Sequence, residues 1–198
     1  MITVGLTGSI GMGKSTVLAM FGKEGAAVWN ADDAVHRLYG RAAKGAVAVA
    51  ARFPEAIVDG AVDREILSGL VLNDAAALAD LEAIVHPLVS EDRAAFLDGA
   101  ARRGADIAVL DIPLLFEKNG EKYFDAVIVV SAASDIQKAR VLARPGMSEK
   151  KFRLILMKQT PDAEKRRRAD YIIDTGEGLN ETREAVKTTM KDLMSRFR

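Results

Sequence analysis

A glycine-rich segment near the start of the chain constrains the fold more than any other feature. Residues 8–15 read GSIGMGKS and fit the pattern G-x-x-x-x-G-K-[ST]. The preceding residues 2–7 are apolar and partly β-branched, as in a buried parallel strand, and residues 16–21 can open a helix. Because strand, loop and helix follow in the required order, the segment predicts a phosphate-binding loop. An incidental glycine-rich turn is the alternative.

Each residue type in this loop has a chemical reason. Glycines reach backbone conformations closed to other residues, so successive N–H groups can converge on an anion at the helix N-terminus. We expect Lys14 to reach the β- and γ-phosphates of a nucleotide, and the Ser15 hydroxyl to ligate Mg²⁺. The expected nucleotide contacts are Gly8, Gly11, Met12, Gly13, Lys14, Ser15 and Thr16.

Composition excludes several classes of site and partner. The 198 residues include no cysteine, so disulfides, thiolate metal sites and a cysteine nucleophile are excluded, and two distant histidines argue against structural zinc. Basic and acidic residues balance at 28 each, which gives no reason to expect nucleic acid or an anionic membrane. The chain lacks a membrane-span pattern and a signal-peptide start, so we expect a cytoplasmic protein without an obligate protein partner.

Candidate site carboxylates lie near the carboxyl ends of two of the four later segments that read as strands, which are residues 25–30, 107–112, 125–131 and 171–174. Ligands of an open parallel sheet sit beyond the carboxyl ends of its strands. Asp32 or Asp33 could therefore orient or deprotonate an attacking hydroxyl, or else cap the following helix. Asp111 resembles a Walker-B carboxylate that holds Mg²⁺ through water, or else bonds a neighbouring backbone group.

The stretch from about residue 34 to 104 reads as a helical insertion, and no convincing strand is found in it from Arg41 onward. Helices are expected over residues 42–52, from Asp63, over 74–85, and from Pro87 to about 103 after an interruption at His86–Pro87. Such an insertion would cover the ligand-binding rim and bind a substrate. His86 alone has a plainer interpretation, as a residue that bonds backbone where two helices meet.

A basic run lies between residues 138 and 168. Arg140 and Arg144 are spaced i, i+4, so on one helix they share a face, and Pro145–Gly146 follows as a hinge would. One interpretation is a mobile lid over about 138–165 that carries arginines onto a transferring phosphoryl group. The other is a solvated helix face, which suits Arg166 to Arg168 better. A last amphipathic helix is expected over residues 180–197.

Together these residues resemble the dephospho-CoA kinase family along essentially the whole chain. The phosphate loop is shared with many kinases and ATPases, whereas the combination with His-Pro and Pro-Leu-Leu-Phe-Glu is far more specific. Asn30 stands where the family has Asp, and Thr175 where it often has Asn. The matching positions are residues 6–15, Ala31-Asp32, Asp63-Arg64, Leu67, His86-Pro87-Leu88, Pro113-Leu114-Leu115-Phe116-Glu117, Gln137, Arg140, Arg144, Gln159, Lys165, Ala169-Asp170 and Ile173.

The resemblance implies an α/β fold of the P-loop NTPase type, with three layers, a five-stranded parallel sheet, and helical substrate-binding and lid subdomains. It implies ATP-dependent phosphorylation of the ribose 3′-hydroxyl of dephospho-CoA. Asp32 would orient that hydroxyl and accept its proton. Charge on the phosphoryl group would be stabilised by Lys14, Mg²⁺ on Ser15, Arg140 and Arg144, and the implied substrate contacts are Asp32, Arg64, His86, Pro113, Leu114 and Glu117.

Two other functions remain open at this point. One is another small-molecule kinase of the same fold, for a nucleotide or a shikimate-like acceptor. The other is a non-catalytic nucleotide-binding regulator, against which the intact Lys14, Ser15 and Asp32 count. A GTPase is disfavoured because neither an Asn-Lys-x-Asp nor an Asp-x-x-Gly motif occurs. The metal role of Asp111 rests on its place near the end of a strand alone, since the family does not fix this residue.

Overall fold

The chain forms two compact units in the computed structural model, which describes residues 1–197. The larger unit comprises residues 1–28 and the chain from Ala100 onward, and the smaller unit comprises Trp29–Gly99. Each unit has a hydrophobic core of its own. The smaller unit covers most of the stretch in which the sequence predicts a helical insertion.

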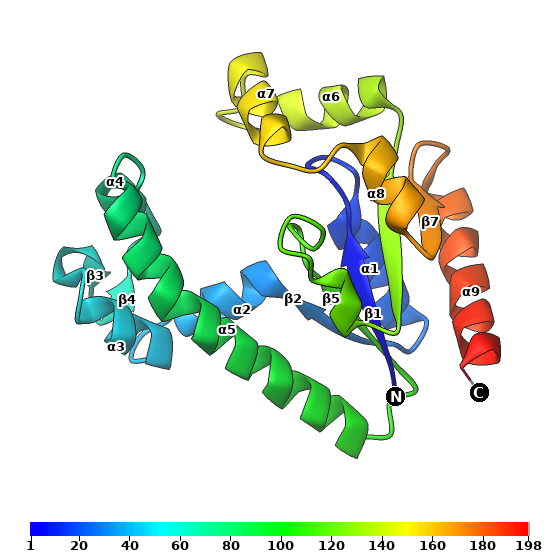
Figure 1. Ribbon diagram of the computed structural model, residues 1–198, viewed down its shortest axis with the longest axis horizontal. Helices are drawn as coiled ribbons and strands as arrows, with labels where there is room; N and C mark the ends of the chain where they lie inside the picture. The colour runs from blue at the N-terminus through cyan, green and yellow to red at the C-terminus, as the bar shows by residue number, and fades with distance from the viewer. Residues whose placement is uncertain (198) are drawn as a thin grey trace. The chain divides into compact units, whose positions relative to one another are not determined.

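A five-stranded sheet organises the larger unit, with the strand order β2-β5-β1-β6-β7 (Figure 1). β1 lies at its centre and pairs in parallel with β5 and β6, and β6 pairs in parallel with β7. β5 and β6 are buried throughout, which explains their almost continuously apolar sequences. The expected five-stranded α/β fold is confirmed, with strands at Ile2–Thr7 (β1), Ala27–Asn30 (β2), Ile107–Asp111 (β5), Ala126–Ser131 (β6) and Tyr171–Asp174 (β7).

Helices and a loop segment cover the two faces of this sheet and make three layers. α1 (Lys14–Lys23) and α9 (Leu179–Arg196) pack together on one face, where Ile128 and Val130 of β6 join their core. The alternate residues Val127 and Val129 point to the other face and pack with Leu115 and Phe116. The predicted terminal helix is thereby confirmed.

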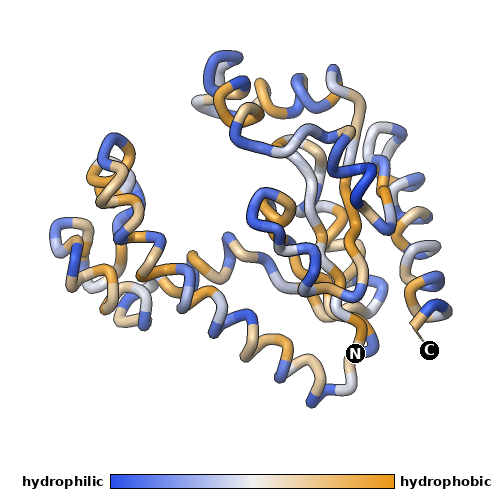
Figure 2. The backbone as a smooth tube through the Cα atoms, in the orientation of Figure 1, coloured by the Kyte–Doolittle hydropathy of each residue, from blue (hydrophilic) through white to orange (hydrophobic). Residues whose placement is uncertain are grey.

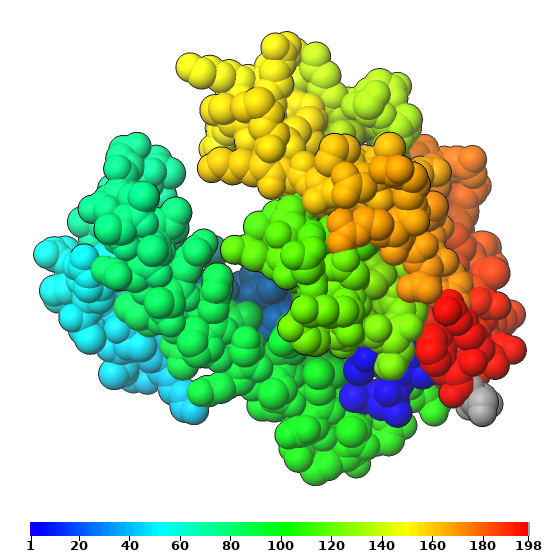
Figure 3. Space-filling model, in the orientation of Figure 1, coloured from blue at the N-terminus to red at the C-terminus, as the bar shows by residue number. Residues whose placement is uncertain are grey.

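An arm of two helices extends beyond the carboxyl ends of β1 and β6 in the larger unit (Figure 1). It consists of α6 (Ser134–Leu142) and α7 (Glu149–Met157), and α8 (Asp162–Arg168) leads back to the sheet. The Ser148 hydroxyl caps α7 by accepting a hydrogen bond from the Lys151 N–H at 3.2 Å. In Figure 3, α7 forms part of the outer surface of this unit.

The smaller unit is mainly helical and has a core that includes Val49, Phe53, Leu67 and Val71. Trp29 is buried and donates its indole N–H to Asp92 Oδ1 at 2.7 Å, and Arg37 donates to the same oxygen at 2.7 Å. This contact fastens the first helix of the unit to its longest one. The elements are α2 (Ala31–Leu38), α3 (Lys44–Ala50), η1 (Pro54–Ala56), β3 (Ile57–Val58), β4 (Ala61–Val62), α4 (Arg64–Val71) and α5 (Ala75–Arg102).

A short hairpin in the smaller unit contradicts the expectation that this stretch contains no strand. β3 and β4 pair in antiparallel fashion through Ile57 opposite Val62. The two turn residues, Asp59 and Gly60, both have positive φ, as a type I′ turn requires. Each strand is only two residues long, so no alternation of apolar and polar residues marks it, but Asp-Gly is a hairpin signal that the prediction overlooked.

The predicted interruption at His86–Pro87 is also wrong. α5 continues unbroken from Ala75 to Arg102, with Pro87 in its interior. An interior proline removes one backbone hydrogen bond and costs roughly 3 kcal/mol. The helix tolerates this proline because most of its 28 residues favour a helix, so the helical turns before and after Pro87 outweigh one lost hydrogen bond. Asp74 caps the start by accepting from the N–H groups of Ala76 and Ala77.

Apolar residues follow this architecture along the chain. In Figure 2 the strands of the sheet are mainly apolar, whereas the outer turns of the arm are mainly polar. Among the residues that the structure describes, no helix combines the length and the apolar character needed to cross a bilayer.

Candidate active site

The phosphate loop joins the carboxyl end of β1 to the N-terminus of α1, and its glycines are sterically required. A Cβ atom on Gly8 would lie 2.4 Å from the carbonyl oxygen of Val130, and one on Gly11 would lie 2.5 Å from Cγ2 of Val141. Gly13 has φ +89° and is the N-cap of α1 without a capping side chain. The first turn of α1 therefore offers backbone N–H groups and a positive helix end to an anion.

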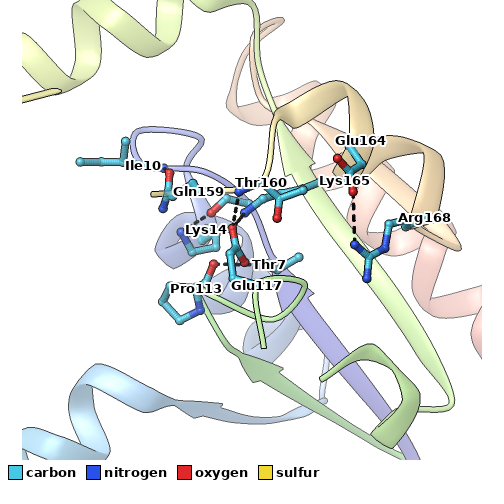
Figure 4. A network of polar contacts seen from close by, with 11 residues as sticks. Thr7, Ile10, Lys14, Pro113, Glu117, Gln159, Thr160, Glu164, Lys165 and Arg168 are labelled. Carbon is cyan, nitrogen blue, oxygen red and sulfur yellow. Dashed lines mark hydrogen bonds and ion pairs between the residues drawn. The ribbon is translucent and has the colours of Figure 1, made fainter. Parts of the chain in front are cut away.

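Lys14 folds across this loop. Its ammonium group donates a hydrogen bond to the carbonyl oxygen of Gly8 at 2.8 Å (Figure 4). The positive charge is thereby held next to the glycine-rich loop, close to the N-terminus of α1. This is the location in which a lysine can neutralise phosphate charge.

A pocket of about 380 Å³ brings the loop together with the two arginines singled out in the sequence. Its lining consists of Gly11, Gly13, Thr16, Arg140, Arg144, Thr175, Leu179 and Thr182. One wall is the phosphate loop and the first turn of α1, and the others come from α6, the end of β7 and α9. The arrangement combines an anion cradle with two permanent positive charges, which suits a nucleotide that carries several phosphates.

Arg144 does not share a helix face with Arg140, contrary to the prediction from their spacing. α6 ends at Leu142, and Arg144 lies in the turn after it, where its N–H donates to the carbonyl oxygen of Val141 at 3.1 Å. Both arginines nevertheless line the same pocket. The turn, rather than the helical repeat, brings them together.

Arg140 is linked to the phosphate loop through Thr175. Its guanidinium group donates to the Thr175 hydroxyl at 2.9 Å and to the Thr175 carbonyl oxygen at 2.7 Å. The same hydroxyl donates to the carbonyl oxygen of Met12 at 2.9 Å. Thr175, which stands where the family often has Asn, thus connects Arg140 with the phosphate loop. Its neighbours in the sequence do not indicate this connection, and only the hydrogen-bonding hydroxyl group of Thr175 could have suggested it.

Two oxygen donors near the loop suit Mg²⁺. Asp111 lies at the carboxyl end of β5, is 3% exposed and is in register with Leu6 of β1, and Ser15 lies in the first turn of α1. No group of three or more acidic or histidine side chains among the described residues could hold a metal by itself. Mg²⁺ takes one or two protein oxygen ligands and completes its shell with phosphate and water, so the donor chemistry of Asp111 and Ser15 fits this ion.

Glu117, an expected substrate contact, is engaged in a different set of interactions. Its Oε1 accepts a hydrogen bond from the Thr160 N–H at 2.7 Å and forms an ion pair with Lys165 Nζ at 3.0 Å (Figure 4). Burial on its own raises the pKa of Glu117, but the hydrogen bonds and the buried ammonium of Lys165 outweigh it and hold this pKa below its ordinary value. Its substrate contact remains a prediction.

Two other expected contacts from this region have different surroundings. The carbonyl oxygen of Pro113 accepts a hydrogen bond from the Thr7 hydroxyl at 3.3 Å, at the edge of the phosphate loop. Leu114 is 41% exposed and is open to a ligand. Their roles in substrate binding also stay predictions.

The remaining predicted site residues belong to the smaller unit and have exposed side chains. Asp32 lies in the first turn of α2, Arg64 opens α4, and His86 lies within α5. Asn30 caps α2 by accepting from the Asp33 N–H at 3.0 Å, so neither aspartate is the N-cap. The alternative interpretation of His86, as a residue at a junction of two helices, is wrong because α5 has no junction there.

Some residues around the site carried no signal of their own in the sequence. Leu179 and Thr182 line the pocket from the start of α9, where they read as ordinary helix residues. The family resemblance names Gln137 and Gln159 without giving them a role, and it names Lys165, which also belongs to the basic run. Each of these residues acts through contacts with residues far away in the sequence, so a local sequence pattern could not have revealed its role at the site.

Comparisons with known proteins agree on one family. The dephospho-CoA kinase family profile matches residues 2–181. A dephospho-CoA kinase from Mesorhizobium japonicum is 55% identical over 193 residues, which is 98% of this chain and 97% of that protein. A crystal structure of a Thermus thermophilus protein has a TM-score of 0.80 and 34% identity, covering 100% of this chain and 98% of that one. A shikimate kinase from Acinetobacter baumannii, at 14% identity and a TM-score of 0.55, covers 100% and 95% and shares the fold alone.

Proposed function

Since this chain belongs to the dephospho-CoA kinase family, we propose that it transfers the γ-phosphoryl group of ATP to the ribose 3′-hydroxyl of dephospho-CoA, giving ADP and coenzyme A. The observation that carries the proposal is the pocket in which Arg140 and Arg144 face the phosphate loop. A fold shared with shikimate kinase does not choose an acceptor, whereas high identity over nearly the whole chain does favour this one.

The larger unit supplies the charges for phosphoryl transfer. In the transition state, negative charge spreads over the oxygens of the transferring group while its bond to ADP breaks and the bond to the acceptor oxygen forms. Lys14 and the N–H groups of the first turn of α1 stabilise that charge from one side. Arg140 and Arg144, which line the same pocket as Gly11, Gly13 and Thr16, add their positive charges to this stabilisation.

Mg²⁺ would be held by Ser15 and Asp111, and when bound it supplies further neutralisation of the β- and γ-phosphates. Support comes from the two oxygen donors beside the loop.

The smaller unit supplies the acceptor side in this proposal. Asp32 accepts the proton of the 3′-hydroxyl as the new bond to phosphorus forms, and its carboxylate orients the hydroxyl beforehand. Arg64 and His86 contribute exposed polar groups for dephospho-CoA. The lid over about 138–165 closes on the nucleotide, and its Pro145–Gly146 turn has the positive φ of +70° at Gly146 that a tight bend needs.

An acceptor panel tests the proposal. With ATP and Mg²⁺, ADP release is measured with dephospho-CoA, adenosine, a nucleoside monophosphate and shikimate. We expect kcat/KM for dephospho-CoA to exceed that of every other acceptor by roughly 10⁴-fold, because binding of the whole substrate is used to reach the transition state. Lys14→Ala is the control, expected to keep the fold by circular dichroism and to lose turnover.

Two outcomes would contradict it. A better kcat/KM with a nucleotide or with shikimate would assign the protein to a different acceptor. ATP binding without turnover of any acceptor would favour a regulator.

A further inference from the structure

Both glutamines of the chain bind the same residue of the phosphate loop. The sequence contains two glutamines, Gln137 and Gln159. Gln137 Nε2 donates to the carbonyl oxygen of Ile10 at 2.8 Å. Gln159 Oε1 accepts from the N–H of Ile10 at 3.1 Å (Figure 4). These two groups belong to the two peptide planes that flank Ile10, so both planes are held in orientation by side chains from outside the loop.

The orientation of the plane between Ile10 and Gly11 matters because its second residue is a glycine. Gly11 has φ +80°, a region that glycine enters as readily as negative φ, so the peptide between Ile10 and Gly11 can turn over at little cost. Turned over, it would direct a carbonyl oxygen where an N–H group now points, and a carbonyl dipole repels phosphate. The bond from Gln137 holds this carbonyl toward α6 and directs the Gly11 N–H the opposite way.

The two glutamines come from the two ends of the arm. Gln137 is 6% exposed on α6, which presses on the loop so closely that Gly11 admits no side chain beside Val141. Gln159 follows α7. The segment 138–158 contains α7 and the Pro145–Gly146 turn. It therefore begins directly after Gln137 and ends directly before Gln159, the two residues that bind Ile10.

The position of Gln159 is itself fixed from the other side. The next residue, Thr160, donates its N–H to Glu117, which pairs with Lys165 at 3.0 Å. The Lys165 side chain is fully buried and that of Glu117 is 14% exposed. Buried pairs of this kind are costly to separate, so the chain that follows Gln159 is held firmly.

We propose that Gln137 and Gln159 are positioning residues for phosphoryl transfer, which hold the peptide groups of Ile10 so that the loop presents N–H groups to the nucleotide and responds to movement of the arm. The proposal rests on the proposed function for its kinetic part. Neither side chain touches the reacting atoms. Their effect passes through the backbone of Ile10.

The test replaces each amide with a side chain of similar size that cannot make the bond. Gln137→Met, Gln159→Met and the double variant are compared with Lys191→Met, a control at an exposed residue of α9 outside the loop, the arm and the pocket lining. We measure kcat, KM for both substrates, direct ATP binding and the melting temperature. Each single variant is expected to lower kcat about 10-fold to 100-fold and to weaken ATP binding, because small misplacements cost that much. KM for dephospho-CoA and the melting temperature should change little, and the Lys191→Met control should keep the kcat and ATP affinity of wild type.

The double variant makes the test specific. Since both glutamines act on one residue, its loss in kcat is expected to fall well short of the product of the single losses. Additive losses, equal changes in both KM values, a melting temperature that falls in step with kcat, or an equal effect of Lys191→Met would overturn the proposal. If wild type failed on dephospho-CoA, unchanged ATP affinity in the variants would still refute it and reduced affinity would still support it.

Discussion

Asp32 and Asp33 are neighbours in the first turn of α2, yet we expect only Asp32 to act in the chemistry. Successive helical side chains point in directions about 100° apart, so the two carboxylates cannot serve one hydroxyl equally. Asp32→Asn should lower kcat by roughly 100-fold or more, the lower range for a general base, with ATP affinity nearly unchanged. Asp33→Asn should stay within about threefold of wild type.

Steady-state kinetics with dephospho-CoA, beside an ATP-binding titration, checks this prediction. A crippled Asp33→Asn enzyme with an active Asp32→Asn enzyme would show that the assignment is off by one residue. If neither substitution mattered, catalysis would rest on phosphate electrostatics alone.

At the scale of single residues, the sequence predicted best where the chemistry is local. The pattern from Gly8 to Ser15 carries its own strand, turn and helix signals, and the structure places the loop as expected. Asn30 is the opposite case. It was noticed as a departure from Asp, but its role as the cap of α2 depends on where the helix begins, a boundary that sequence patterns place poorly.

At the scale of elements, Arg140 lies on α6 and Arg144 lies in the turn after it, so we expect the two arginines to differ in their roles. Arg140 binds Thr175, whose hydroxyl donates to the Met12 carbonyl oxygen, whereas Arg144 lines the pocket from the turn after α6. Arg140→Ala should therefore lower kcat by roughly 100-fold and also raise KM for ATP, and Arg144→Ala should lower kcat with a smaller change in that KM.

Arg166→Ala is the matched control, because Arg166 is an exposed arginine of the same basic run that donates to the Ser131 hydroxyl at 3.2 Å and does not line the pocket. Its kcat should remain within about threefold of wild type. Equal, small effects of all three substitutions would instead favour a solvated charged surface over an active lid.

At the scale of elements, the sequence predicted every strand of the main sheet, because buried parallel strands are short apolar runs with clear ends. It failed where two rules compete. A proline usually ends a helix, but α5 carries Pro87 in its interior because long helical flanks outweigh one lost hydrogen bond. The hairpin at Asp59–Gly60 was missed because its strands are too short for a periodic signal.

For the whole molecule, the buried pair of Glu117 and Lys165 predicts a dependence of stability on pH. The pKa of Glu117 in the folded protein is held below its ordinary value of 4.5. The pair therefore contributes its full stabilisation above that value, and the contribution is lost as pH falls through the folded pKa. We expect the free energy of unfolding to decrease below about pH 4.5, more steeply than in a Glu117→Gln, Lys165→Met double variant.

Urea denaturation at neutral pH and at about pH 3 measures this difference. Lys165→Met alone should cost roughly 3 kcal/mol or more at neutral pH, since it leaves a buried carboxylate without its partner. The double variant should recover much of that loss. A single variant as stable as wild type would show that the ion pair is not needed for folding.

The same pair marks the limit of sequence reasoning at this scale. Lys165 stood in a run of four basic residues and read as part of a charged surface or a lid, yet its side chain is fully buried. Lys165 meets Glu117 only because the fold brings α8 against the loop after β5, and the two residues are 48 positions apart in the sequence. Pairings over such distances leave no local trace.

The single tryptophan gives this enzyme a built-in optical reporter. Trp29 is 5% exposed, its indole N–H is bonded to Asp92, and it stands a few residues before Asp32 at the start of the smaller unit. All tryptophan emission therefore originates at one known position, beside the carboxylate expected to meet the acceptor. Acceptor binding can thus be followed in real time on the natural protein, without a dye and without an added label.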